Sequence, residues 1–210
     1  MISLSEILHT IAQALMIPCL IILIILMAGA VWQIGDIVVE YIAERRKHKC
    51  NVPQLLRDVH AAGADGLAEL IENSGLLRRQ KKALLELAES RGLPKDTLTA
   101  LAERLLATEE ARNACTTSIT DMIAKLGPMF GLLGTLIPLG PGIVALGQGD
   151  TVTLSESMNV AFDTTIAGVI SAAVASVISH IRKRWYNDDM VSLETLMEAV
   201  LEEVTSDVEG

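Results

Sequence analysis

The sequence predicts an all-α integral membrane protein with three transmembrane helices, helical cytoplasmic extensions and the N-terminus outside. The first observation is composition: the 210-residue chain is 50% hydrophobic, with a mean hydropathy of +0.42, although 20% of its residues are charged. The second is that the apolar residues are gathered into three long runs, apart from the charged residues. The third is that basic clusters follow the first and third runs only, which indicates an orientation by the positive-inside rule.

Residues 1–39 are expected to hold an N-terminal segment and the first transmembrane helix. No charged residue lies between Thr10 and Gly35, and a spanning helix needs about 20 predominantly apolar residues. A cleaved signal peptide would begin with basic residues and have a shorter apolar stretch of about 7–15 residues. Here Glu6 precedes the run, and no Lys or Arg does. We therefore expect a retained membrane helix, with Trp32 near a membrane interface.

Residues 40–125 are predicted to form a helical cytoplasmic loop. Leucine and alanine recur there at helical spacing, for example at Leu101 and Leu105. Pro94 and the polar residues after it predict the start of a new helix at Lys95. We expect this helix to continue into the second span.

Residues 126–149 form the second predicted transmembrane helix, which is uncharged but rich in glycine and proline. Such residues are tolerated in membrane helices where neighbouring helices cover the freed backbone groups. Two prolines lack a backbone donor and are expected to kink the helix, Pro138 and Pro141. Three glycines have spacings that let membrane helices approach closely: Gly127, Gly131 and Gly134.

A short outer link, residues 150–156, leads to the third predicted transmembrane helix, residues 157–181. Thr153 and Glu156 have the spacing of a capping box at its start. Within the helix, small and polar side chains gather on one side: Thr164, Thr165, Gly168, Ser171, Ala172, Ala175, Ser176 and Ser179. Because the second span has a similar face, we expect these faces to meet each other, other subunits or a central helix.

Three polar side chains in these spans are candidates for an ion path. The hydroxyls of Thr135 and Thr165 could interact with an ion or a partner's carboxyl group, or could instead bond to the carbonyl one turn back. Asp163 is a carboxylate within an apolar run, which is costly in a membrane and therefore indicates a function. By helical angle it lies roughly opposite Thr165. It is either a second ion ligand or a structural group bonded to Asn159 near the outer mouth.

Residues 182–210 are predicted to form a cytoplasmic amphipathic helix with an acidic tail. Apolar residues recur at helical spacing from Met190 to Val204, with acidic residues opposite. This stripe could serve subunit contact, partner docking or packing on the chain's own helices. The basic clusters at 45–49 and 182–184 should both be cytoplasmic, which fits an odd number of spans with the N-terminus outside.

Several classes of function are disfavoured. The net charge of −9 argues against nucleic-acid binding, which rests on a basic surface. Cys19, Cys50 and Cys115 are far apart, so we expect free thiols without a disulfide framework or zinc site. The four histidines are scattered, and no metal or other cofactor is expected. No common hydrolase or metalloprotease motif occurs, so we do not expect an enzyme.

Two segments resemble the MotA/TolQ/ExbB proton channel family. Residues 131–136 read Gly-Leu-Leu-Gly-Thr-Leu, which is similar to the GLxGT(V/L) signature of that family's second span. Residues 161–168 contain a threonine followed three residues later by glycine, as in its third span. Thr135 and Thr165 match the two family threonines. The resemblance covers residues 126–178, and the arrangement of the spans extends it.

This resemblance implies the channel or stator subunit of a motor complex that is driven by a proton or sodium gradient and transmits energy to the cell envelope. Such a subunit forms a homopentamer in the cell (inner) membrane around a dimer of an ExbD/TolR-like single-span protein that carries an essential aspartate. Spans two and three line the pore. Thr135 and Thr165 would face it and help H⁺ or Na⁺ reach the partner's carboxylate. No cofactor is implied beyond the transported ion.

The chain also departs from the family pattern. Asp163, Pro138 and Pro141 stand where family members often have other residues. The short cytoplasmic loop and the three spans favour a TolQ/ExbB-like role over a flagellar stator. The alternative function is a non-conducting membrane scaffold that recruits a partner through its cytoplasmic helices. The two functions differ in whether the hydroxyls of Thr135 and Thr165 matter, because both need the small faces for assembly.

Overall fold

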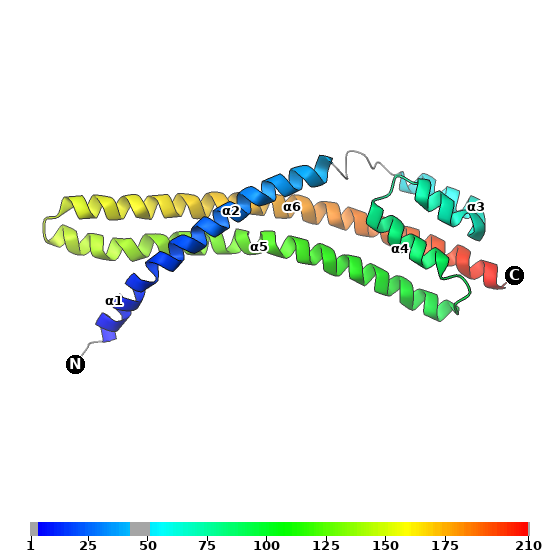
Figure 1. The fold of residues 1–210 in the computed structure, drawn as a ribbon, viewed down its shortest axis with the longest axis horizontal. Coiled ribbons are helices and arrows are strands. Elements are labelled where there is room, and N and C mark those ends of the chain that lie inside the picture. Colours follow the sequence, from blue (N-terminus) through cyan, green and yellow to red (C-terminus); the bar gives the residue numbers. More distant parts are fainter. Residues whose placement is uncertain (1–3, 43–50, 210) are drawn as a thin grey trace. The chain divides into compact units, whose positions relative to one another are not determined.

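The computed structural model describes residues 4–42 and 51–209, and every regular element in these ranges is a helix. In chain order the helices are α1 (Leu4–Ala14), α2 (Met16–Glu40), α3 (Val52–Asn73), α4 (Arg78–Glu89), α5 (Lys95–Gly147) and α6 (Thr151–Glu209) (Figure 1). The predicted all-α class is confirmed for these residues. The basic cluster at 45–49 and Cys50 lie outside them, and the orientation of the N-terminus stays a prediction.

Three helical segments are long and apolar enough to cross a membrane: Thr10–Glu40, Lys95–Gly147 and Thr151–Thr205. They confirm the three predicted spans as candidates by length and composition. Helix α5 has 53 residues and α6 has 59, whereas about 20 residues suffice for a span. The expected membrane edges near residues 125 and 181 therefore fall inside continuous helices. Helix α5 begins at Lys95, directly after Pro94, as the sequence predicted.

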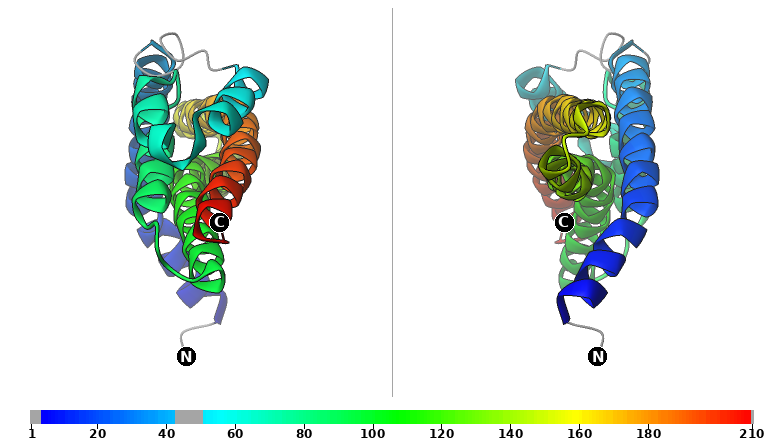
Figure 2. Two further views of the ribbon diagram at one scale, coloured as in Figure 1. Left: turned by 90° about the vertical axis from the view of Figure 1, so that its right-hand side faces the viewer. Right: turned by 90° about the vertical axis from the view of Figure 1, so that its left-hand side faces the viewer.

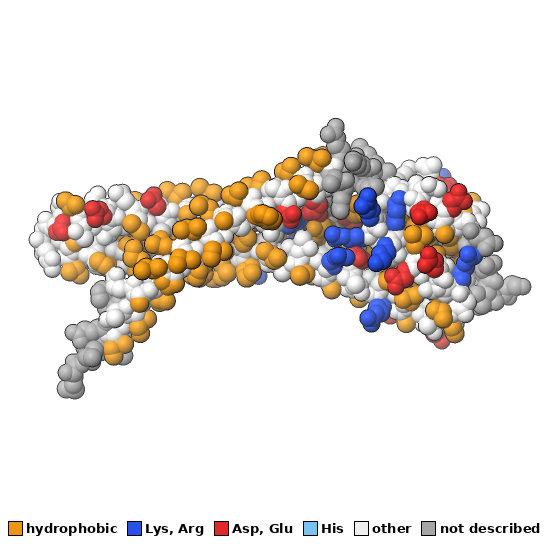
Figure 3. Space-filling view, viewed as in Figure 1, with side chains coloured by type: hydrophobic (Ala, Val, Ile, Leu, Met, Phe, Trp, Pro, Cys, Tyr) orange, Lys and Arg blue, Asp and Glu red, His pale blue; other side chains and the backbone are white. Residues whose placement is uncertain are grey.

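The chain divides into two compact units, and α5 and α6 contribute to both. The first, here called the membrane unit, comprises Met1–Ile37 and Thr117–Ile181. The second, here called the head unit, comprises Val38–Thr116 and Arg182–Gly210. On the face drawn in Figure 3, hydrophobic side chains dominate the membrane unit, and Lys and Arg side chains gather on the head unit. This segregation agrees with the separation of apolar and charged runs along the chain.

Within the membrane unit, α2 packs against the hairpin that α5 and α6 form (Figure 1). One apolar cluster includes residues of all three helices: Leu26, Ala30, Ile123 and Ala175. Nearer the start of α2, the thiol of Cys19 donates to the carbonyl oxygen of Phe130 at 3.5 Å. Helix α2 is thereby fixed to one side of the hairpin over several turns.

Asp150 caps the N-terminus of α6, so the predicted capping box of Thr153 and Glu156 is wrong. The Asp150 carboxylate accepts hydrogen bonds from the backbone N–H groups of Val152 and Thr153, both at 3.1 Å, and from Thr153 Oγ1 at 2.6 Å. The hydroxyl and amide of Thr153 lower the pKa of this carboxyl. A carboxylate just before the first turn accepts several donors, and the helix dipole favours its charge, so Thr153 acts as a donor.

The head unit has its own hydrophobic core. Helices α3 and α4, the start of α5 and the end of α6 all contribute to it, with buried residues that include Val59, Leu67, Leu84, Leu87, Leu98, Leu193, Leu196, Met197 and Val200. The apolar stripe predicted near the C-terminus therefore packs on the chain's own helices. Helix α3 bends at Gly63, whose φ of 62° is a conformation that glycine adopts readily.

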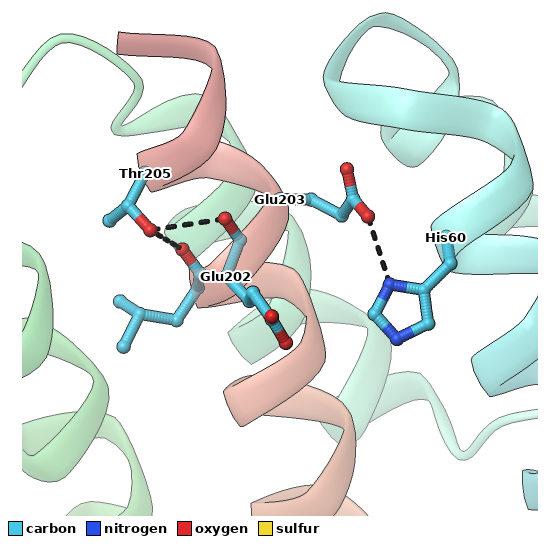
Figure 4. A network of polar contacts seen from close by, with 5 residues as sticks. His60, Glu202, Glu203 and Thr205 are labelled. Atoms are coloured by element: carbon cyan, nitrogen blue, oxygen red, sulfur yellow. Dashed lines mark hydrogen bonds and ion pairs between the residues drawn. The ribbon is translucent and has the colours of Figure 1, made fainter. Parts of the chain in front are cut away.

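An exposed polar contact joins α3 to α6 in the head unit (Figure 4). Nδ1 of His60 lies 2.9 Å from Oε1 of Glu203. Thr205, two residues after Glu203 in α6, donates its hydroxyl proton to the carbonyl oxygens of Leu201 and Glu202. Because the His60 side chain is 51% exposed, solvent screens the contact with Glu203 and it adds little stability. The apolar core holds these helices together.

A buried arginine connects the end of α2 with α6 in the head unit. Arg182 is 1% exposed, and its Nε donates to Oε2 of Glu40 at 3.1 Å. Next to this pair, the rings of Tyr41 and Trp185 stack with their centroids 6.1 Å apart. Burial, the negative charge of Glu40 and a hydrogen bond to Glu40 raise the pKa of Tyr186 to about 12. These contacts hold the end of α2 against the part of α6 that follows the third predicted span.

We expect Tyr186 to ionise near pH 12, whereas an unperturbed tyrosine ionises at about pH 10. The chain has two tyrosines, so the ultraviolet absorbance of phenolate in the Tyr41→Phe variant reports Tyr186 alone. The raised pKa favours the neutral phenol in the folded state, so its contribution to stability is complete below about pH 10 and is lost as the pH rises toward 12. Glu40→Gln should lower the midpoint. A midpoint near pH 10 in the folded Tyr41→Phe protein would contradict this environment.

Candidate pore-facing site

The contact between α5 and α6 in the membrane unit depends on glycine. A Cβ atom added to Gly127 would lie 2.7 Å from the carbonyl oxygen of Gly168. One added to Gly134 would lie 2.7 Å from Cβ of Thr164. A Cβ atom on Gly168 would lie 2.5 Å from the carbonyl oxygen of Gly127 and 2.9 Å from Cα of Gly131. The two helices can approach this closely only because each of these contacts has a glycine on at least one side.

The remaining residues predicted for helix packing lie along the same contact. Ser171 is 1% exposed and Ala175 is 0% exposed. The hydroxyl of Ser171 donates to the carbonyl oxygen of Ala167 at 2.7 Å. Of the small and polar face predicted for the third span, Ser176 is exposed, Thr165 is half-buried and the others are buried.

Helix α5 continues without interruption through the prolines of the second span. Pro138 is buried and Pro141 is half-buried, and both lie within α5 together with Pro128. The kink expected at Pro138 and Pro141 stays a prediction.

Helix α2 covers one side of the α5–α6 pair. In α5, Leu126 and Phe130 pack in the cluster with α2, and each precedes a glycine that faces α6. In α6, Val174 packs in the same cluster and precedes the buried Ala175. Successive residues of a helix are about 100° apart, so residues just before the contact positions turn toward α2. The right-hand view in Figure 2 shows α2 running beside the hairpin.

Thr135 and Thr165 lie on the other side of the hairpin. Thr135 follows Gly134, Thr165 follows Thr164, and Gly134 and Thr164 face each other. Because the two helices are antiparallel, a step of one residue, about 100°, turns both side chains toward the same side of the pair. Both side chains are half-buried. The two threonines therefore share the face that α2 leaves uncovered.

Each of these threonines donates its hydroxyl proton within its own helix. Oγ1 of Thr135 lies 2.6 Å from the carbonyl oxygen of Leu132, and Oγ1 of Thr165 lies 2.9 Å from that of Ala161. This is the local bonding that the sequence offered as the alternative to an ion contact. The two are compatible, because a hydroxyl that donates its proton keeps its lone pairs as acceptors. Such an oxygen can accept a proton from a carboxylic acid or coordinate a cation.

Asp163 lies on the opposite side from the two threonines. It precedes Thr164, so it turns toward the side of the hairpin that α2 occupies, and its side chain is exposed. Among the residues that the structure describes, Asp163 makes neither a hydrogen bond nor an ion pair, so the bond to Asn159, one of the two alternatives for this residue, is absent there. The geometry separates this carboxylate from Thr135 and Thr165.

A protein-family model described as the MotA/TolQ/ExbB proton channel family matches residues 70–195. This segment is well over half of the chain. The chain belongs to this family. No curated protein matches the sequence. Membership and the three apolar helices make the chain a membrane protein of the ion-channel type found in motor complexes.

The family match is wider than the segment on which the sequence resemblance rested. It begins in α3 and ends in α6, so it includes most of the head unit. In the sequence, Arg182 is recognisable only as part of a basic cluster that indicates orientation, whereas its ion pair with Glu40 depends on the fold. Nothing in the sequence marked the polar residues Thr120, which is 0% exposed, and Asp121, which is half-buried, because both precede the apolar run of the second span. A sequence alone does not show which of its polar residues are buried, because burial depends on the residues that the fold brings next to them.

Proposed function

We propose that this chain is the channel and stator subunit of a TolQ/ExbB-like motor complex driven by H⁺ or Na⁺. Five copies form a ring in the cell (inner) membrane around a dimer of an ExbD/TolR-like single-span protein. The N-terminus lies outside and the head unit lies in the cytoplasm. The complex transmits the energy of the ion gradient to the cell envelope. The chain is not an enzyme and needs no cofactor besides the transported ion.

The observation that carries this proposal is the uncovered face of the hairpin. Helix α2 packs on one side of α5 and α6, and Thr135 and Thr165 share the other. In a ring whose first span lies outermost, that face points to the centre, where the partner's helix would stand. Both hydroxyl groups donate their protons to backbone carbonyl oxygens, so their oxygen lone pairs stay available as acceptors. A protonated aspartic acid of the partner can donate to them, and Na⁺ can bind to them.

Asp163 has less support as a member of the ion path. A carboxylate in a membrane helix is commonly functional or paired with another group. Its position on the side of α2 places it away from the threonine face, near the outer end of α6. In a ring, this side chain would be available to a neighbouring copy or to the outer mouth.

The TolQ/ExbB-like branch is favoured by the size of the chain's parts. There are three candidate spans, and the segment between the first two contains only α3, α4 and the beginning of α5. The apolar stripe of α6 packs on these helices, so it is buried in the head unit and is not an open surface for contact with a flagellar rotor.

The mass of the detergent-purified complex, with and without the single-span partner, tests assembly. The proposal requires a five-subunit ring that takes up two copies of the partner. A monomer or dimer that stays unchanged when the partner is added would instead favour the membrane scaffold.

Replacing both Thr135 and Thr165 by valine should reduce ion flux through the reconstituted complex by tenfold or more. Valine keeps the branched shape, while each hydroxyl lost removes an interaction with a charged or acidic group, worth about 1.5–3 kcal/mol. Flux into liposomes under an imposed H⁺ or Na⁺ gradient measures the effect. Thr195→Val is the matched control, because Thr195 makes the same local bond to Val191 but lies in the head unit. Normal flux in the double variant would exclude these hydroxyls from the path.

A further inference from the structure

A second polar cluster lies in the membrane unit, at the end of the α5–α6 contact that is remote from the turn between the helices. Thr120 is 0% exposed, Ser179 is 4% exposed and Thr117 is 7% exposed. The hydroxyl of Ser179 donates a short hydrogen bond to Oδ1 of Asp121, which is half-buried. Four polar side chains from two helices thus gather where an apolar contact would suffice for packing.

Thr120 distinguishes this cluster from ordinary polar packing. Its Oγ1 is a buried oxygen without a hydrogen-bond partner among the described residues. Thr135, Thr164 and Thr165, in contrast, all donate to a carbonyl oxygen in their own helix. Buried hydroxyls in native proteins are almost always satisfied, and one without a protein partner indicates a bound water or ion.

Helical spacing puts Thr120 and Ser179 on the facing sides of α5 and α6, and Asp121 bonds to Ser179 from the position next to Thr120. Thr120 lies two turns before Gly127 and so shares its face, which points at α6. Ser179 lies two turns after Ala172, the residue opposite Gly127. Asp121 follows Thr120 by one residue, so it turns toward the uncovered side, as Thr135 does. Along α5, Asp121 and Thr135 are about 21 Å apart at 1.5 Å per residue.

We propose that Asp121, Ser179 and Thr120 bind a hydrated monovalent cation at the inner end of the ion path. The place of this site on a path rests on the proposed function, but its chemistry does not. The ligands are one carboxylate and two hydroxyls, an oxygen-only set whose single negative charge matches that of a monovalent cation with its water. The water completes the bonding of Thr120. In a ring of subunits the carboxylates would repeat around the axis, and such rings of acidic side chains select cations in channels.

Thermal unfolding of the purified full-length protein in detergent tests the site. A cation that binds only the folded state raises Tm as its concentration rises. At constant ionic strength, replacing choline chloride by NaCl or LiCl should raise Tm by roughly 2–4 °C. Asp121→Asn and Ser179→Ala should lose most of this rise. Ser171→Ala is the matched control, because Ser171 is a buried serine of the same helix that donates to its own backbone.

Thr120→Val separates a cation site from a packing defect. Valine fills the same space without the hydroxyl. If the Thr120 hydroxyl is simply unsatisfied and takes no part in cation binding, the variant should be as stable as the wild type or more stable in choline. It should then also keep the whole cation-dependent rise in Tm. The proposal requires that the rise falls by at least half.

Every outcome decides for or against the site. A wild type whose Tm does not respond to Na⁺ or Li⁺, or a response that Asp121→Asn, Ser179→Ala and Thr120→Val all retain, overturns it. If Asp121→Asn does not fold, Ser179→Ala and Thr120→Val decide by the same measurement. The experiment needs neither the partner nor ion flux, so a negative result would not argue against the proposed ring. A chain that forms no ring but shows the response would keep the site and lose the motor role.

Discussion

Replacing Glu40 by alanine is expected to destabilise the head unit by about 3–5 kcal/mol, because it removes a carboxylate that pairs with a buried arginine. Arg182 is 1% exposed and Glu40 is 17% exposed, and their side chains meet at 3.1 Å. The variant also removes the group that accepts the hydrogen bond of Tyr186. For a chain of this length each kcal/mol corresponds to about 2–4 °C in Tm. Thermal unfolding in detergent should therefore show a decrease of roughly 6–20 °C.

Two controls separate the loss of the pair from the loss of any carboxylate. Glu89→Ala removes an exposed glutamate at the end of α4 and should change stability by no more than about 0.5 kcal/mol. The double variant Glu40→Leu/Arg182→Met removes both charges and should recover most of the loss, because well-packed apolar residues can replace a buried ion pair. If Glu40→Ala unfolds no earlier than Glu89→Ala, the pair does not stabilise the fold.

The fold was largely predictable because a bilayer constrains a sequence so strongly. A spanning segment must satisfy its backbone internally and must be apolar over about 20 residues. The uncharged stretch that begins at Thr10 meets both conditions, and it coincides with the candidate span Thr10–Glu40. Helix ends were less predictable. Gly127 and Pro128 stand beside the expected edge near residue 125, yet α5 continues through them, and α6 continues through the expected edge near residue 181.

Only the arrangement of the site residues along each helix could be predicted. The sequence shows the spacing of Gly134, Thr135 and Thr165, but it does not show which residues of the facing helix they meet. That Gly134 faces Thr164, which leaves Thr165 on the uncovered side, depends on the register between two helices. Arg182 was equally hidden, since a basic residue after a span normally lies at the membrane surface and not in a core.

Replacing Gly168 by alanine is expected to disrupt the hairpin. The new methyl group would lie 2.5 Å from the carbonyl oxygen of Gly127 and 2.9 Å from Cα of Gly131. These are backbone atoms of the facing helix, so a side-chain rotation cannot relieve the contact and the helices must separate. Overpacking of this kind costs about 1–3 kcal/mol, and Gly168→Val should cost more. Thermal unfolding measures the loss.

Gly140→Ala is the matched control in the same hairpin. A Cβ atom on Gly140 would meet nothing within 4 Å, and alanine favours a helix over glycine by about 1 kcal/mol. This variant should be as stable as the wild type or more stable. Because the register of the hairpin also sets the direction of Thr135 and Thr165, Gly168→Ala should reduce ion flux even in protein that stays folded, while Gly140→Ala should not. Equal stability and flux in the two variants would mean that the backbone contact at Gly168 is not what positions the threonine face.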